Sequence, residues 1–157
     1  MISLEPYDSI EQIQSNHVYN KKVIAKLRDL STSYASCPDL WVALGDALQL
    51  SDDDYPIEEA VECYQTALRC DDSHFAAYEE LGWVSEGVYE DLPKAEEYFR
   101  LAIQHGADET AMVGLARVLA QTGRESEALQ VLRECEDQSM EEVAELRREI
   151  KSGVWRQ

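Results

Sequence analysis

One pattern of apolar residues occurs three times along the chain, at intervals of 34 to 37 residues. Each copy opens with large side chains next to a very small residue, and a second segment then places small residues around a bulky one. The first copy comprises Trp41, Leu44, Gly45, Leu48, Ala60, Tyr64 and Ala67, the second Tyr78, Leu81, Gly82, Ala95, Phe99 and Ala102, and the third, looser copy Leu115, Ala116, Ala128, Leu132 and Cys135. A repeat of this length indicates stacked pairs of helices.

The small residues of the pattern have a packing role. Gly45, Gly82 and Ala116 keep one face of a helix thin, so that the partner helix of each pair can approach closely. Large residues then fill the space between successive pairs, and burying them supplies much of the stability. These large residues are Trp41, Tyr64, Tyr78 and Phe99. The sequence therefore predicts an all-α fold, in agreement with its low content of glycine and proline, 7 and 4 residues.

Turn and capping signals place the expected helices. We expect Asp8 or Ser9 to cap a short helix, and a second helix over about 20–34 to share a face formed by Val23, Leu27, Leu30 and Tyr34. Helix pairs should follow over about 38–50 and 56–68, 76–86 and 92–105, and 111–121 and 126–136, and an S-x-x-E capping box at 139–142 should open a last helix. The resulting division is a disordered tail at 1–7, a degenerate helix pair at 8–37, three repeats at 38–136, and a capping helix and tail at 137–157.

The pattern resembles the signatures of the tetratricopeptide-repeat family over about residues 38–136. Trp41-x-x-Leu44-Gly45 matches the first helix of that repeat, Ala60-x-x-x-Tyr64 matches the second, and residues 86–99 look like a Sel-type variant. The resemblance implies a right-handed superhelix, an α-solenoid of about three helix pairs with capping helices at both ends. The chain departs from the family in three ways: extra residues around 52–54, no proline closing each repeat, and no aromatic residues in the third repeat.

The resemblance also implies where a partner would bind, because the first helix of each pair forms most of the concave surface in this family. The residues at the matching positions, which we predict to line a partner-binding groove, are Asp39, Val42, Asp46, Gln49, Glu79, Trp83, Glu86, Val113 and Arg117. Trp83 fits two interpretations equally, an anchor for the partner or a residue buried against the next repeat. The lysine and asparagine clamp of the chaperone-binding members is absent.

The charge of the chain is concentrated in its middle. The net charge is −18, and residues 39–109 contain nineteen acidic residues against Arg69, Lys94 and Arg100. Such a surface repels nucleic acid and anionic lipid and attracts basic partners. Many of these carboxylates are expected only to keep the surface solvated, but the groove as a whole favours a basic or amphipathic helical ligand.

Signals for other functions are missing. The four cysteines have no metal-binding or redox spacing, Asp52-Asp53-Asp54 has no calcium-loop pattern, and His17, His74 and His105 are expected at the surface or at helix ends. No nucleophile elbow, phosphate loop or dinucleotide motif occurs, so we expect no enzyme, no metal and no cofactor. The first residues lack the features of a leader peptide and no segment is apolar enough to span a membrane, which favours the cytoplasm.

These observations favour a protein-interaction scaffold or adaptor that binds a partner protein or peptide through an acidic concave groove. Two alternatives stay open. The chain could be a dedicated chaperone or an immunity-type antagonist that sequesters one basic partner, or it could be a structural subunit that associates with copies of itself.

Overall fold

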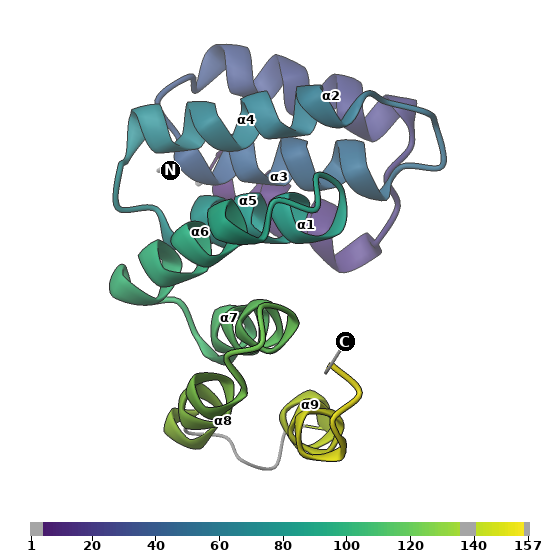
Figure 1. Cartoon of the computed structure of the whole chain (residues 1–157). Coiled ribbons are helices and arrows are strands. Elements are labelled where there is room, and N and C mark those ends of the chain that lie inside the picture. The colour runs from purple at the N-terminus through teal and green to yellow at the C-terminus, as the bar shows by residue number, and fades with distance from the viewer. Residues whose placement is uncertain (1–4, 136–140, 156–157) are drawn as a thin grey trace. The chain divides into compact units, whose positions relative to one another are not determined.

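The computed structural model describes residues 5–135 and 141–155, and this part of the chain contains nine α-helices and no strand (Figure 1). The helices are α1 Tyr7–Asn16, α2 Lys21–Ser33, α3 Pro38–Leu50, α4 Ile57–Cys70, α5 Phe75–Gly87, α6 Leu92–Gln104, α7 Glu109–Gln121, α8 Glu125–Glu134 and α9 Glu141–Ser152. The expected all-α fold is confirmed. The chain forms two compact units, Met1–Ala77 and Tyr78–Gln157, and the boundary between them falls inside α5.

Local capping chemistry determines where several helices begin. The side chain of Asn20 accepts hydrogen bonds from the backbone amides of the first turn of α2, and Asp91 and Asp108 do the same for α6 and α7. Pro38 opens α3, where its missing N–H costs nothing. Gly106 follows α6 with φ of +100°, a left-handed conformation that favours glycine.

The first two helices differ in detail from the sequence prediction. Neither Asp8 nor Ser9 caps α1: the helix begins earlier, with Pro6 at the N-cap position, and the Ser9 hydroxyl donates instead to Glu5 at 2.8 Å. In α2 the buried face consists of Ile24, Leu27 and Ser31, while Tyr34 is exposed. Burial of Ser31 is possible because its hydroxyl donates to the Leu27 carbonyl at 2.8 Å.

The core of the first unit lies between α3 and α4, which run side by side (Figure 1). Tyr64 of α4 is fully buried against Gly45 of α3. A Cβ atom at Gly45 would lie 2.5 Å from a carbon of the Tyr64 ring, closer than real contacts allow. The predicted pairing of a small residue with a large one is therefore confirmed at this crossing point.

The second unit repeats this pairing and extends it. Phe99 of α6 is fully buried, and Gly82 of α5 lies against its ring, with a Cβ position 2.8 Å away. Gly114 of α7, which the repeat pattern did not single out, also lies against Phe99, with a Cβ position 2.5 Å away. Two glycines from two different helices thus make room for one phenylalanine ring.

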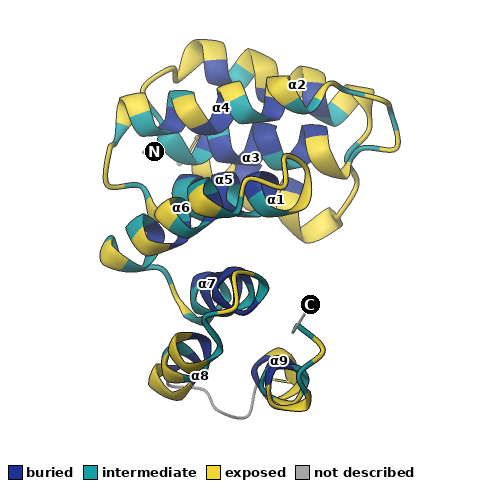
Figure 2. Ribbon diagram, in the orientation of Figure 1, coloured by how far each residue is buried: buried dark blue, intermediate teal, exposed yellow. Residues whose placement is uncertain are grey.

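Helix α9 completes the core of the second unit. Its residues Val143, Leu146 and Ile150 are buried in one cluster with α7 and α8, as expected for a capping helix, and Trp155 packs partly against this cluster. Figure 2 shows the buried residues of these three helices on the sides that they turn toward one another. The first residues of the predicted capping box, 139 and 140, lie outside the described residues.

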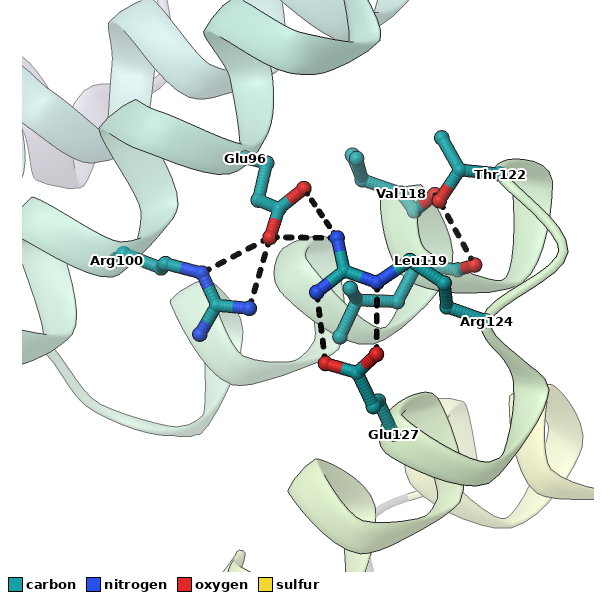
Figure 3. A network of polar contacts seen from close by, with 7 residues as sticks. All are labelled: Glu96, Arg100, Val118, Leu119, Thr122, Arg124 and Glu127. Carbon is teal, nitrogen blue, oxygen red and sulfur yellow. Dashed lines mark hydrogen bonds and ion pairs between the residues drawn. The ribbon is translucent and has the colours of Figure 1, made fainter.

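A network of charged side chains joins α6 to the start of α8 (Figure 3). The Arg124 guanidinium donates to both carboxylate oxygens of Glu96 at 2.8 and 2.9 Å and to Glu127 at 2.7 and 2.8 Å. Arg100 donates to the same Glu96. Because Arg124 lies directly before α8, this network fixes the turn between α7 and α8 relative to α6.

Candidate interaction surface

The four predicted groove residues of the first unit lie on α3, and their side chains are largely engaged within the unit. Val42 is buried, so it contributes to the core and offers no open surface. Asp46 accepts a hydrogen bond from the Tyr64 hydroxyl at 2.9 Å, and the Gln49 amide donates to the same hydroxyl. Asp46 and Gln49 therefore satisfy the polar end of a buried tyrosine.

The Asp46 carboxyl is stabilised in its neutral form. Burial raises its pKa from 3.8 to about 6, and the hydrogen bond from Tyr64 opposes this change only in part. A charged carboxylate loses hydration when it is buried, and one hydrogen bond does not replace that hydration. Near neutral pH, Asp46 therefore carries its charge at a cost to the folded state.

The remaining groove residue of the first unit, Asp39, lies at the start of α3 and contacts His74. Their side chains are 3.0 Å apart, between Asp39 Oδ1 and His74 Nε2. The sequence predicted His74 at the surface or at a helix end: it lies directly before the first residue of α5, and its side chain is only 13% exposed. The contact joins the first turn of α3 to the segment that follows α4.

The groove residues of the second unit lie on two helices. Glu79, Trp83 and Glu86 follow one another along one side of α5 at spacings of four and three residues, and Arg117 lies on α7. The Arg117 guanidinium carbon is 5.5 Å from the centroid of the Trp83 ring. Gln121, one turn after Arg117, donates to Glu86 Oε1 at 2.6 Å. We call these five residues the Trp83 surface.

The Trp83 side chain is half-buried. The sequence allowed either a residue buried against the next repeat or an exposed anchor for a partner, and the observed burial is intermediate between the two. Its ring meets the ring of Phe99 edge to face, with centroids 4.8 Å apart and planes at 73°. Its indole N–H, the single donor of the side chain, is hydrogen-bonded to Glu79. The ring is thus fixed from the core side by Phe99, along its own helix by Glu79, and by the guanidinium of Arg117.

Glu79 titrates near neutral pH. Burial raises its pKa from 4.5 to about 7, the Asp108 carboxylate adds to the increase, and the hydrogen bond from Trp83 opposes it. Its charge therefore depends on pH in the range where most binding measurements are made.

Val113, the remaining groove residue of the second unit, is buried in the core. Gln121, which does belong to the Trp83 surface, was not among the predicted residues. Its position four residues after Arg117, on the same side of α7, was the signal that could have found it.

An open hollow of about 1060 Å³ adjoins this surface at Gln121. Leu92, Val154 and Trp155 give it apolar walls, and the turn from Gln121 to Glu127 gives it polar ones. Val154 is one of the most exposed large hydrophobic residues of the described chain, at 69%. The second unit therefore presents a charged aromatic surface beside an apolar hollow.

The aspartate-rich turn and the histidines make ordinary structural contacts. Asp53 in the turn before α4 contacts Lys21 at 3.4 Å, as a polar turn residue would. His105 stacks on Tyr78 with ring centroids 5.6 Å apart. Among residues 5–135 and 141–155, no three His, Cys, Asp or Glu side chains gather in a way that could hold a metal ion. Within the same part of the chain, no helix combines the length and the apolarity needed to cross a lipid bilayer.

Helices in sequence-adjacent pairs, with glycines facing aromatic rings where they cross, define a helical-repeat protein. The chain superposes on the crystal structure of TTC0263, a thermophilic TPR protein of Thermus thermophilus, with a TM-score of 0.70 and 17% sequence identity. The match covers 92% of this chain and 77% of that one. No protein-family model and no curated protein sequence matches the chain.

The structural match confirms a fold like that of tetratricopeptide-repeat proteins. At 17% identity the likeness defines the fold alone, so any binding role has to be argued from the side chains of this chain. The handedness of the superhelix and the exact limits of the repeats stay predictions.

Proposed function

We propose that this chain is a protein-interaction module, not an enzyme, and that the Trp83 surface binds a basic, amphipathic helical segment of a partner protein. The observation that carries the proposal is the half-buried Trp83, which is hydrogen-bonded to Glu79 and lies on the same side of α5 as Glu86. Tryptophan residues fixed in partly desolvated positions contribute much of the energy of protein interfaces.

The charge around this surface supports a basic partner. Within the second unit, residues 78–109 contain nine acidic residues and only two basic ones, and both of these basic side chains contact carboxylates of their own helix. Long-range attraction would therefore bring a positively charged segment to this part of the chain, and added salt would weaken its binding.

The neighbouring hollow supports an amphipathic helix in particular. Gln121 belongs both to the Trp83 surface and to the wall of the hollow, next to apolar Leu92 and Trp155. A helix that carries arginines on one side and leucines on the other could place its charges beside Glu79 and Glu86 and its apolar side in the hollow.

The proposal is tested by titrating the isotope-labelled protein with a synthetic arginine- and leucine-containing amphipathic peptide while recording NMR spectra. We expect shifts in the Trp83 indole signal and in the amides of α5 and α7, and an affinity that falls with added salt. The double variant Glu79→Gln/Glu86→Gln should bind more weakly, because it removes two charges while it keeps the hydrogen-bond acceptors.

Two controls make the result decisive. Glu142→Gln/Glu145→Gln removes the same charge from exposed positions of α9 and should leave binding almost unchanged. A twin peptide with glutamate in place of arginine should not bind. Equal binding of the two peptides, or equal effects of the two double variants, would contradict the proposal.

The same module could act as an adaptor or as a dedicated antagonist that sequesters one basic protein. These roles differ in measurable properties, since an antagonist holds one partner tightly in a one-to-one complex. Self-association is the third possibility, and light scattering over a wide concentration series separates it, because a strict monomer cannot be a self-assembling subunit.

A further inference from the structure

Arg117 is placed unusually for a cation in an acidic protein. No ion pair involves Arg117 among the described residues, although Glu79 and Glu86 lie on the neighbouring helix α5. Its guanidinium carbon lies 5.5 Å from the centroid of the Trp83 ring instead. This distance is within the range of a cation–π interaction, for which tryptophan is the best aromatic acceptor.

The environment of Trp83 suits a guanidinium better than other groups. The ring is held by its edge-to-face contact with Phe99 and by the hydrogen bond from its indole N–H to Glu79, so it presents a fixed surface. Nearby carboxylates favour a positive charge, and a planar, weakly hydrated guanidinium stacks on an aromatic ring more readily than a lysine ammonium does.

The contact between the Arg117 guanidinium and the Trp83 ring is also weak enough to be replaced. Arg117 is half-buried on a long flexible side chain, and a single cation–π contact near the surface is weak. An arginine from a bound partner could take the same position while the Arg117 side chain turns toward water.

We propose that the Trp83 ring is a subsite for an arginine side chain of the basic partner, and that Arg117 occupies this subsite in the unbound chain as an internal competitor. The inference rests on the proposed function, which it deepens by naming the partner residue. Binding of the partner then requires one guanidinium to replace another on the same ring.

The variant Arg117→Gln tests the inference, with Arg133→Gln as its matched control. Both changes remove one positive charge from the second unit, but Arg133 lies on the exposed side of α8. The probe is the arginine-containing amphipathic peptide, compared with a twin in which citrulline replaces arginine. We expect Arg117→Gln to strengthen binding of the arginine peptide about two- to fivefold, the range that one exposed cation–π contact represents.

The citrulline peptide and the Arg133→Gln variant should show no comparable gain. In a Trp83→Leu background the gain from Arg117→Gln should disappear, and Trp83→Phe, which keeps a weaker aromatic acceptor, should retain part of it. Circular dichroism and urea titration check that each variant is folded. If Trp83→Leu does not fold, the Trp83→Phe background replaces it, and there the gain from Arg117→Gln should be smaller than in the wild type.

Several results would overturn the inference. They are an unchanged or weaker affinity of Arg117→Gln, an equal gain in Arg133→Gln, or an equal gain with citrulline. Any of these three results leaves the proposed function intact, provided that the wild-type chain binds the arginine peptide and that this binding depends on Glu79 and Glu86. Absence of peptide binding in every variant contradicts both.

Discussion

Gly114 of α7 lies so close to Phe99 of α6 that a Cβ atom at Gly114 would come within 2.5 Å of two carbons of the ring. Phe99 is fully buried, and Gly82 of α5 lies against the same three carbons of its ring. The close approach of α6 and α7 therefore depends on the absence of a single methyl group.

The first prediction follows from this contact. Gly114→Ala should lower the free energy of unfolding by about 1 to 3 kcal/mol, because the added methyl overpacks the Phe99 ring. Urea denaturation measures the change. Gly87→Ala is the control, since a Cβ atom there meets nothing within 4 Å, and it should be neutral or slightly stabilising. A Gly114→Ala variant as stable as the wild type would show that the ring can move aside.

A second prediction concerns Asp46 and the pH dependence of stability. In the unfolded chain its carboxyl loses its proton near pH 4, but in the folded chain only near pH 6, so the folded state binds more protons between these values. The contribution of this group to stability is therefore complete below about pH 4 and is lost as pH rises through about 6.

Asp46→Asn removes this loss while it keeps an oxygen that can accept from Tyr64. At about pH 8 the variant should be more stable than the wild type by about 1 to 2 kcal/mol. The variant avoids the cost of a buried negative charge, and part of this gain is offset because the amide oxygen accepts a weaker hydrogen bond from Tyr64 than a carboxylate does. Urea titrations of both proteins at a series of pH values measure the difference, which should shrink toward acid pH. A difference that does not depend on pH would contradict the assignment to Asp46.

A third prediction concerns binding. Glu79, whose pKa is raised to about 7, is negative at about pH 8 and largely neutral at about pH 6. The arginine peptide should therefore bind more weakly as pH falls across this range. Blocked peptide termini ensure that the peptide itself does not titrate, and isothermal titration calorimetry at the two pH values gives the affinities.

Glu79→Gln identifies the group responsible. The variant should bind with nearly the same affinity at both pH values, close to that of the wild type at acid pH. If Glu79→Gln keeps the full pH dependence, Glu79 is not the group responsible and the assignment is wrong.

The sequence predicted the helices and the crossing points best where the repeat pattern was clear. Gly45 and Gly82 recur at one position of the pattern, and both lie against an aromatic ring as expected. Gly114 was missed because it stands two residues before the equivalent position, Ala116, and serves the contact with the preceding helix. A pattern built from one contact surface does not report a residue that belongs to the next.

The candidate site was less predictable, for a reason that concerns side chains. The positions of Trp83 and Arg117 follow from the helix register, but their contact depends on the conformation of a long flexible side chain. In the same way, register alone gave no sign that Asp46 and Gln49 would turn toward the hydroxyl of Tyr64. The helix register therefore predicted which residues lie on the surface. It did not predict which contacts their side chains form, because these depend on the polar groups around each side chain.

The contact of Phe99 with glycines of two different helices also affects how the chain folds as it emerges from the ribosome. Once α5 and α6 have left the exit tunnel, Gly82 can pack against the ring, but the part of the ring that Gly114 covers stays exposed to water until α7 has also left the tunnel. During that interval the nascent chain exposes apolar surface of the kind that makes incompletely folded chains prone to aggregate.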